Sequence, residues 1–300
     1  MKSYIAEKLE TFKKNNKNRA RLLINCDDQP GIVATVSQFL YDHQANILES
    51  NQYSTDPNGG GEFFIRIEFE IEDLKNQVNQ LEQDFEEIKD QFQLEATFKY
   101  VDQIKKVAIF VSKEPHCLLE LLWEWQSGDL MADISLVISN HDTSREFVEP
   151  LGIPYYHIPA NKDIRKQVEE EQIALLKEHE IDVIVLARYM QILTPHFVET
   201  FKNKIINIHH SFLPAFIGAK PYERAYQRGV KLIGATSHYV TNDLDEGPII
   251  EQDISRVDHR DNAEAMKKIG QSVERSVLAR AVKWQLDDRI IVYGNKTIVF

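Results

Sequence analysis

The chain has 300 residues and a mass of 34.8 kDa, a length at which one or two domains are expected, each large enough to bury a core. Its hydrophobic fraction of 43% and charged fraction of 27% exclude disorder as the main state. The 35 basic and 47 acidic residues give a formal charge of −12, which argues against a main role in coating nucleic acid or an anionic membrane. A small anionic ligand is compatible with this charge, because a local basic patch can oppose the overall sign.

The cysteines and the N-terminus predict a reduced, cytoplasmic setting. Cys26 and Cys117 lie far apart and form neither a CxxC pair nor a dense disulfide pattern. The opening MKSYIAEKLETFKKNNKNR mixes Lys with Glu and has no apolar stretch typical of a secretory signal. The chain has no run of about 18 consecutive apolar residues, so no membrane span is predicted.

The first hundred residues predict a small α+β unit. The apolar segment 20–26 favours a strand, and after DDQPG the residues Ile32, Val36, Phe39 and Leu40 recur at helical spacing. We expect further elements in this order: strand 46–55, strand 62–71, helix 73–90 and strand 92–100. The resulting order βαββαβ is typical of a ferredoxin-like fold, with two helices on one face of a four-stranded antiparallel sheet.

From about residue 105 strands alternate with helices, which is typical of an α/β domain with a mainly parallel sheet. We therefore place the domain boundary at 100–105. The expected strands are 106–112, 132–139, 155–157, 181–187, 204–208, 231–240 and 248–254. The expected helices are 116–128, 144–150, 161–180, 195–202 and 261–284. The closing RIIVYGNKTIVF predicts a hairpin around Gly294 and Asn295, added at a sheet edge.

Asn207 and His209 stand at the end of the strand expected at 204–208, where ligands bind in open α/β sheets. Two positions apart on a strand, they project from the same side. The segment FLPAFIGAKP that follows predicts a loop. An amide that donates to an oxyanion and an imidazole that transfers a proton suit acyl chemistry.

The loop 241–247 offers a carboxylate that could orient His209 or accept a proton from water. On chemistry alone Asp243, Asp245 and Glu246 all qualify. Each part of the pattern also has an ordinary interpretation, as a strand-end cap or as turn chemistry, so spacing alone leaves the function open. A metal is not indicated by the adjacent His209 and His210, because neighbours on a strand face opposite sides, and HExxH, CxxC and GxSxG patterns are absent.

The run NIHHSFLPAFIGAKPYERAYQRGVKLIGATSHYVTNDLDEGPIIEQ strongly resembles the folate-dependent formyltransferase fold shared by glycinamide ribonucleotide and methionyl-tRNA formyltransferases. The resemblance implies that Asn207 and His209 are catalytic. The family pattern HxVxxxxD, which starts here at His238, selects Asp245 as the catalytic carboxylate. LARYMQILTPHFV resembles the folate-contacting loop of that family. The implied substrate-binding residues are Met190, Gln191, Ile192, Leu193, Asn242 and Asp243, with Arg188 and Lys220 as candidates for the glutamate tail of the folate.

One departure from the transferases concerns the acceptor. Glycinamide ribonucleotide transferases carry a glycine-rich loop, GxGSNL, after the first strand, whereas this chain reads VSKEPHCLLELL. Without those glycines the backbone amides are not expected to cradle a phosphate. The resemblance therefore implies water as the acceptor.

The segment CDDQPGIVATVSQFLYDHQANI resembles the opening of an ACT domain, a module that binds amino acids. The implied organisation is a regulatory domain at 1–100, with Asp28, Gly31 and Asn46 as candidate effector-binding residues, and a catalytic domain at 105–300. This arrangement resembles that of the formyltetrahydrofolate deformylase family. It implies hydrolysis of 10-formyltetrahydrofolate to tetrahydrofolate and formate, in support of one-carbon metabolism and purine synthesis.

The resemblance also implies a homo-oligomer without a cofactor, metal, nucleic-acid partner or membrane partner. Two alternatives stay open. The protein could transfer the formyl group to an amine, or it could be an amino-acid sensor whose catalytic domain is inactive.

Overall fold

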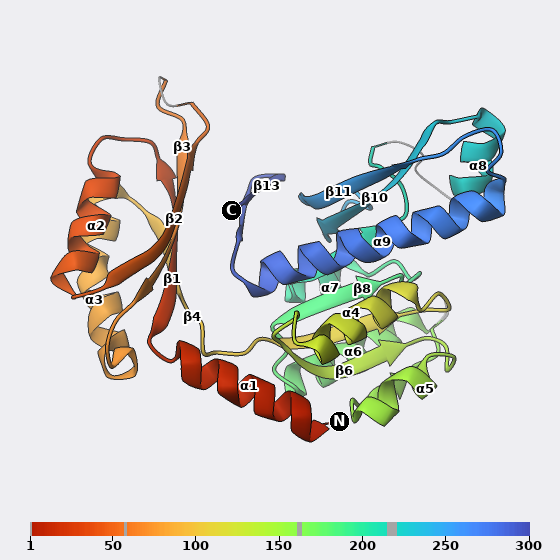
Figure 1. Cartoon of the computed structure of the whole chain (residues 1–300), viewed down its shortest axis with the longest axis horizontal. Helices are drawn as coiled ribbons and strands as arrows, with labels where there is room; N and C mark the ends of the chain where they lie inside the picture. The colour runs from red at the N-terminus through yellow and green to blue at the C-terminus, as the bar shows by residue number, and fades with distance from the viewer. Residues whose placement is uncertain (1, 57–58, 161–163, 215–220) are drawn as a thin grey trace. The chain divides into compact units, whose positions relative to one another are not determined.

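The computed structural model describes residues 2–56, 59–160, 164–214 and 221–300 (Figure 1). The chain divides into two compact units. The large unit contains Lys105–Asp287, Val292–Thr297 and the first residues of the chain. The small unit contains Ala6–Ile104, Asp288–Ile291 and Ile298–Phe300.

The small unit contains a four-stranded antiparallel sheet in the order β2-β3-β1-β4, assigned within the described residues. The strands are β1 (Arg19–Asp27), β2 (Asn46–Ser54), β3 (Glu62–Glu70) and β4 (Glu95–Tyr100). Helices α2 (Ile32–Asp42) and α3 (Leu74–Phe92) cover one face (Figure 1). The predicted βαββαβ order is confirmed.

The core of the small unit lies between its sheet and α2 and α3. Alternate residues of the strands, such as Leu22 and Ile67, are buried with the helical side chains Phe39 and Phe85. The rings of Phe39 and Phe85 meet edge to face with centroids 5.0 Å apart. This arrangement follows from the twofold period of the strands and the helical spacing of the apolar residues in α2 and α3.

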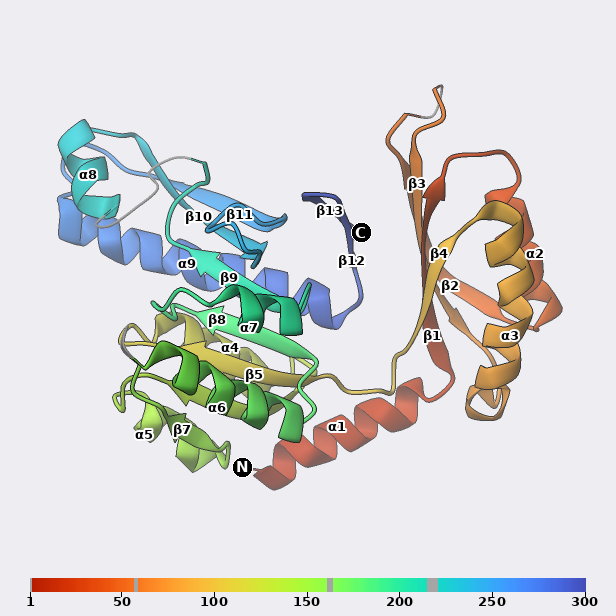
Figure 2. The ribbon, with the colours of Figure 1, turned by 180° about the vertical axis from the view of Figure 1, so that it is seen from behind.

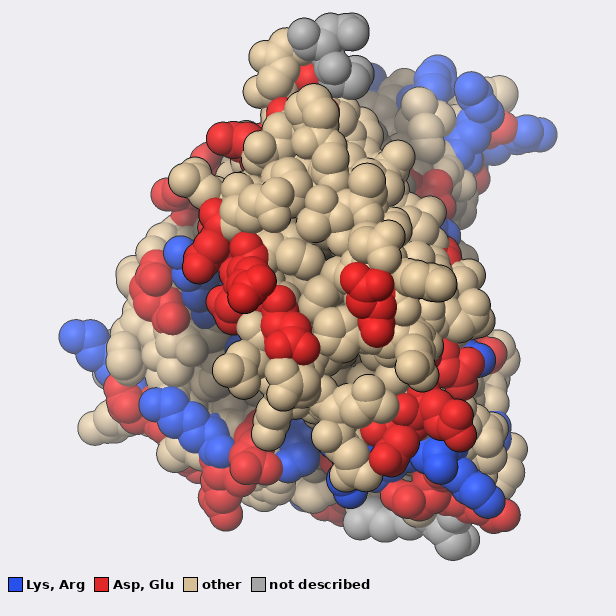
Figure 3. Space-filling model, turned by 90° about the vertical axis from the view of Figure 1, so that its left-hand side faces the viewer, with Lys and Arg blue, Asp and Glu red and all other residues tan. Residues whose placement is uncertain are grey.

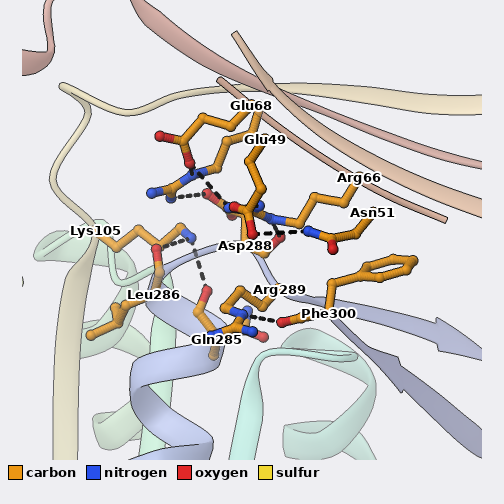
Figure 4. A network of polar contacts seen from close by, with 11 residues as sticks. Glu49, Asn51, Arg66, Glu68, Lys105, Gln285, Leu286, Asp288, Arg289 and Phe300 are labelled. Carbon is orange, nitrogen blue, oxygen red and sulfur yellow. Dashed lines mark hydrogen bonds and ion pairs between the residues drawn. The ribbon is translucent and has the colours of Figure 1, made fainter. Parts of the chain in front are cut away.

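The opposite face of this sheet carries buried charges. Arg66, only 3% exposed, pairs with Glu49 at 2.8 Å and with Glu68 at 3.2 Å. Arg21 pairs with Glu68 at 3.0 Å and with the carboxylate of Asp288 at 3.1 Å, and the Asp288 carbonyl accepts a hydrogen bond from Arg66 (Figure 4). The C-terminal segment thus covers two arginines that each have carboxylate partners, as buried charges require.

The outer surface of the small unit has a wide area without Lys, Arg, Asp or Glu side chains, bordered by acidic residues, below the tip of the β2–β3 hairpin in Figure 3. Strand β2 is an edge strand. The exposed large hydrophobic side chains of α2 and β2 are Val33, Tyr41, Ile47, Leu48 and Tyr53.

The large unit has a seven-stranded sheet within the described residues, in the order β11-β10-β9-β8-β5-β6-β7. Its strands are β5 (Lys106–Val111), β6 (Asp133–Ser139), β7 (Tyr155–His157), β8 (Val183–Ala187), β9 (Ile205–His209), β10 (Leu232–Tyr239) and β11 (Ile249–Arg256). Strands β5 to β9 pair in parallel, and β10 and β11 join in antiparallel fashion. The predicted mainly parallel sheet is confirmed.

Helices cover both faces of this sheet. Figure 1 shows α4 (His116–Ser127) and α9 (Ala263–Leu286) over one face, and Figure 2, from behind, shows α6 (Arg165–Glu178) and α7 (Pro195–Thr200) over the other. The remaining helical segments are α5 (Arg145–Val148), a 3₁₀ turn at Glu149–Leu151 and α8 (Pro221–Arg228). Asn262 caps the start of α9 by accepting from the Ala265 N–H, and Lys105 donates to the Gln285 and Leu286 carbonyls at its end (Figure 4). In the described part of the chain, no helix is long and apolar enough to cross a membrane.

Three elements differ from the sequence-based expectations. Helix α1 (Lys2–Asn16) was not predicted, because its polar residues hide the helical period. Helix α8 also was not predicted; the segment up to residue 221 was taken as loop, and residues 215–220 lie outside the described part. The C-terminal strands β12 (Ile290–Tyr293) and β13 (Lys296–Val299) form the expected hairpin, but as a separate two-stranded sheet rather than an added edge.

Candidate active site

Asn207 and His209 lie at the carboxyl end of strand β9. β9 lies between β8 and β10, and the antiparallel register with β10 sets Asn207 opposite His238 and His209 opposite Thr236. The Asn207 amide nitrogen lies 3.2 Å from Nε2 of His238. His238 therefore supports Asn207 from the neighbouring strand.

Asp245 reaches these residues from the loop between β10 and β11. Its backbone is left-handed, with φ 59°, and a Cβ on nearby Gly247 would lie 1.9 Å from the Tyr239 carbonyl oxygen, so the turn needs glycine there. The Asp245 carboxylate lies 3.2 Å from Nδ1 of His209 and 3.7 Å from Nε2 of His238. The other two acidic candidates of this loop, Asp243 and Glu246, are exposed.

The hydrogen bonds fix the proton positions on the two imidazoles. Nδ1 of His238 lies 2.9 Å from the Tyr239 carbonyl, which can only accept, so Nδ1 carries the proton. In the neutral ring Nε2 then accepts from the Asn207 amide, which leaves the second amide N–H of Asn207 for a ligand. By the same logic Nδ1 of His209 donates to the Asp245 carboxylate. Nε2 of His209 is enclosed and has no hydrogen-bond partner within the described residues.

The electrostatics keep Asp245 ionised. Burial by itself raises the pKa of the Asp245 carboxyl, but the hydrogen bond from His209 and the neighbouring imidazole of His238 more than offset this, so its pKa lies well below the ordinary value. A carboxylate held in this state stabilises a protonated His209. The arrangement can bind a developing oxyanion and supply a proton.

A cavity of about 900 Å³ opens beside these side chains and is lined by Asn207, His209, His238 and Asp245. All six residues predicted to bind substrate also line it: Met190, Gln191, Ile192, Leu193, Asn242 and Asp243. Met190 and Ile192 are each 58% exposed, so they are not ordinary core residues. Apolar side chains left exposed in a cavity are typical of a small-molecule site.

The loop after β8 that carries these apolar residues is held by side chains that the sequence analysis did not single out. The Met190 N–H donates to Ser112 at 3.0 Å, and the Thr194 N–H donates to Glu169 at 2.9 Å. Arg165 donates to the Ile192 carbonyl. These bonds fix the loop from β5 and α6.

A second set of side chains, centred on Glu274 of α9, lies behind the cavity residues Tyr222 and Arg188, and this cluster also was not predicted. Glu274, 1% exposed, accepts from Tyr222 at 2.5 Å, lies 2.8 Å from Nε2 of His116, and pairs with Arg188 at 3.3 Å. A Cβ on Gly270 would lie 2.1 Å from the Tyr222 hydroxyl, so this close packing needs glycine in α9. One feature of the sequence could have indicated this cluster: Glu274 is an acidic residue at a position of α9 that packs on the sheet.

Arg188 does not lie where a tail-binding residue is expected, because its side chain is 10% exposed and paired with Glu274. Lys220 lies outside the described residues.

His116, Cys117 and Glu274 bring three potential metal-ligand atoms within 4.8 Å of one another among the described residues. Burial raises the pKa of the Cys117 thiol, which therefore stays protonated and is a poor metal ligand. The Arg188 guanidinium supplies the positive charge beside Glu274. The Glu274 carboxylate is therefore better suited to its pairing with the Arg188 guanidinium than to a metal ion.

The candidate effector residues of the small unit are not all together. Asp28 follows β1 and accepts a hydrogen bond from Ser54 at the end of β2, and Gly31, with φ 99°, opens α2 at the same end of the sheet. Asn46 begins β2, eight positions from Ser54, which corresponds to about 26 Å of strand. One small ligand within a single copy cannot touch Asp28 and Asn46 at once.

Comparison with known proteins gives the same division of the chain. Residues 105–282 match the family model of formyl transferases, and residues 20–86 match that of ACT domains. Fold and site thus define a formyltransferase-type domain joined to an ACT domain.

Relatives specify the family further. A formyltetrahydrofolate deformylase of Bacillus subtilis strain 168 is 63% identical over 300 residues and is covered, like this chain, over 100% of its length. The crystal structure of a formyltetrahydrofolate deformylase from Pseudomonas syringae pv. tomato DC3000 is 47% identical, with a TM-score of 0.90 over 94% of this chain and 95% of that one. Glycinamide ribonucleotide transformylase 1 from Symbiobacterium toebii, 26% identical, gives a TM-score of 0.62 over 66% of this chain and 94% of its own. The chain belongs to the formyltetrahydrofolate deformylase family.

Proposed function

We propose that the large unit hydrolyses 10-formyltetrahydrofolate to tetrahydrofolate and formate with Asn207, His209 and Asp245. The observation that carries this is the meeting of the three side chains at one cavity, with Nε2 of His209 unpaired there among the described residues. Folate-derived formate and tetrahydrofolate serve one-carbon metabolism and purine synthesis.

The roles follow from the geometry. Asp245, ionised, orients His209 through Nδ1 and holds the attacking water beside the formyl carbon. Nε2 of His209 and the free amide N–H of Asn207 stabilise the oxyanion, the second a contribution of about 2.7–4 kcal/mol. When the C–N bond breaks, N10 gains a proton from His209, and the water loses its protons to this relay and to solvent.

Water as the acceptor is supported by the residues after β5. His116 begins α4 there, and its imidazole lies 2.8 Å from Glu274. Glu114, just before, lines the cavity, and a hydrogen bond from Lys267 lowers the pKa of its carboxyl. The segment after β5 contains no glycine, so its backbone amides are not expected to cradle the phosphate of an amine carried on a ribonucleotide.

The loop after β8 and the loop 241–245 form the proposed folate site. Met190, Ile192 and Leu193 offer apolar surface for the flat pterin ring, and Gln191, Asn242 and Asp243 offer polar groups for its edge. The reaction needs no cofactor or metal, since one imidazole, one amide and one carboxylate supply every group it uses.

Formate release in the absence of any amine tests the function. Purified protein with 10-formyltetrahydrofolate is expected to release formate and tetrahydrofolate in equal amounts. An amine-dependent transferase would release formate only after an amine is added, and an inactive sensor would release none in either assay.

We propose that the small unit is regulatory and binds an amino acid at the Asp28–Gly31 loop. Asp28 can accept from an ammonium group, and the N–H groups that begin α2 can donate to a carboxylate. Glycine and methionine, titrated against the deformylation rate, are the direct test, with Asp28→Asn as the variant expected to lose the response. A flat response to both amino acids in the wild type would contradict a regulatory site for them and leave the unit a role in assembly.

We also propose that the small unit pairs with that of a second copy. The edge strand β2 has exposed apolar side chains, including Ile47 and Tyr53, and free backbone groups on an edge favour pairing. Light scattering is expected to show an oligomer that Ile47→Lys with Tyr53→Lys converts to monomer, while Leu119→Lys on α4 does not. The cytoplasmic location is a prediction that the free, buried Cys26 and Cys117 support.

A further inference from the structure

The catalytic cavity holds one arginine that the proposed hydrolysis does not use. Arg188 follows β8 in a left-handed backbone conformation, φ 64°, which non-glycine residues rarely adopt. Its side chain lines the same cavity as Asn207, His209 and Asp245. Left-handed backbone at a bulky residue is costly and is found where function requires a side chain to be in one place.

The guanidinium of Arg188 has donors to spare. It is nine-tenths buried; Nε lies 3.3 Å from the Glu274 carboxylate, and Nη1 has no hydrogen-bond partner within the described residues. Its ion-pair partner, Glu274, already accepts from Tyr222 and interacts with His116, so the carboxylate that balances the charge is shared. Buried donors without acceptors are rare in proteins and call for a ligand or another explanation.

His210 connects Arg188 electrostatically with the region of the catalytic imidazole. The rings of His209 and His210 stack with centroids 5.2 Å apart. Burial, and then the charge of Arg188, lower the pKa of His210 to about 4, and His209 contributes in the same direction. His210 therefore lies within electrostatic range of both side chains and is a neutral ring at pH 7.

The reaction creates a carboxylate at this place. Hydrolysis forms a C–O bond to water and breaks the C–N10 bond, so a neutral formyl group becomes formate while N10 gains one proton of the water through His209 and the second proton goes to solvent. The new anion lies next to the ionised Asp245, which repels it. A guanidinium is suited to a planar carboxylate, because it offers parallel N–H donors and a fixed positive charge.

We propose that Arg188 forms a carboxylate-binding subsite that holds the formate released from 10-formyltetrahydrofolate and draws it away from Asp245. The proposal rests on the hydrolysis proposed above. The proximity of Glu274 makes this subsite weak enough to release the product, since it competes with formate for the same positive charge.

The opposing charges give a test in which two variants shift in opposite directions. We measure binding of ¹³C-formate to the full chain by NMR line broadening, without folate, and formate inhibition of the deformylation rate. Arg188→Gln is expected to weaken formate binding about tenfold. Glu274→Gln, which leaves Arg188 unbalanced, is expected to strengthen it several-fold.

Controls separate binding from stability. Arg280→Gln removes an arginine of the same unit that pairs with Glu251 and Asp253 outside the cavity, and is expected to leave formate binding unchanged. The double variant Arg188→Gln with Glu274→Gln keeps the cluster uncharged if the single variant at Arg188 fails to fold, and it too is expected to bind formate weakly.

If both single variants weaken formate binding, or if neither changes it, Arg188 is only the structural partner of Glu274 and the proposal is wrong. Failure of the proposed hydrolysis is seen separately, as wild-type protein that releases no formate from 10-formyltetrahydrofolate, whatever its affinity for ¹³C-formate.

Discussion

Asp245 and Glu274 are two carboxylates of the large unit, each surrounded by hydrogen-bond donors that include a histidine. Asp245 lines the cavity, whereas Glu274 is enclosed behind the lining residues Arg188 and Tyr222. In both, burial raises the pKa of the carboxyl and its partners lower it further than burial raises it. The two carboxylates differ in how completely polar partners surround their oxygens. Glu274 is fully enclosed, with Tyr222, His116 and Arg188 around both oxygens, whereas Asp245 has two imidazoles at 3.2 and 3.7 Å and a side chain 15% exposed.

In the proposed mechanism, that difference separates a reacting carboxylate from a structural one. Tyr222, His116 and Arg188 each use a polar atom to contact Glu274. Of the Arg188 donors, Nη1 has no hydrogen-bond partner among the described residues. The partner of Asp245, His209, presents an unpaired Nε2 at the cavity. We expect substitutions at Asp245 to change the rate and substitutions at Glu274 to change the stability.

The largest expected effect is that of Asp245→Asn on turnover. The amide keeps the shape but loses the charge that stabilises a protonated His209, so kcat is expected to fall roughly 10²–10⁴-fold. Folate affinity, measured by equilibrium binding, is expected to stay within about an order of magnitude. Glu246→Gln, an exposed neighbour in the same loop that does not line the cavity, is the matched control and should turn over like wild type. A variant at Asp245 with near-wild-type kcat would remove it from the mechanism.

Glu274→Ala is expected to act on stability instead. It leaves Arg188 and Tyr222 enclosed without their carboxylate, and breaking a buried ion pair in this way costs about 3–5 kcal/mol. The three tryptophans, Trp123, Trp125 and Trp284, all belong to the large unit, so urea unfolding followed by tryptophan fluorescence reports on it. Glu264→Ala, at an exposed position of the same helix, should change little. Equal losses in both variants would show that the cluster around Glu274 is not stabilising.

Asn207→Ala is expected to lower kcat roughly 10²–10³-fold, equivalent to about 2.7–4 kcal/mol, because it removes one preorganised oxyanion donor. KM should change much less, since the ground-state formyl group carries no full charge. Asn242→Ala, on the cavity wall away from His238, is the comparison expected to raise KM instead. The reverse pattern, a raised KM with unchanged kcat at Asn207, would assign it to substrate binding.

The contrast also shows what the sequence could predict. A strand end and a spacing of two marked Asn207 and His209 as candidates, but their catalytic role and the choice of Asp245 over Asp243 and Glu246 rested on a family pattern. The physical reason is that a left-handed residue in a polar loop leaves no periodic signal, and the register of β10 against β9, which brings His238 to Asn207, is a long-range property. The strands and the two amphipathic helices of the small unit were predictable because each has a period of its own.

Glu274 and Arg188 could not be recognised in the same way. Glu274 stands in α9 among apolar residues, where its exchange for an apolar side chain would leave the helical pattern intact. Arg188 directly follows an apolar strand and was assigned to the folate tail by its charge alone. Only the fold shows that Gly270 admits Tyr222 to Glu274 and that Glu274 and Arg188 form an ion pair.

The smallest predicted effect concerns His210, next to the reacting side of this comparison. Burial, and then Arg188, lower its pKa from 6.5 to about 4, so below pH 6.5 the unfolded chain takes up a proton at this position that the folded chain does not. Burial of neutral His210 therefore costs no stability above pH 6.5. As the pH falls from 6.5 toward 4, it lowers the free energy of unfolding, by about 2 kcal/mol at pH 5. His210→Gln should lower the difference in unfolding free energy between pH 7 and pH 5 by this amount. His196→Gln, an exposed histidine of the same unit, should not. If His210→Gln leaves the pH dependence of the unfolding free energy unchanged, His210 is protonated in the folded protein and its assignment as a neutral ring is wrong.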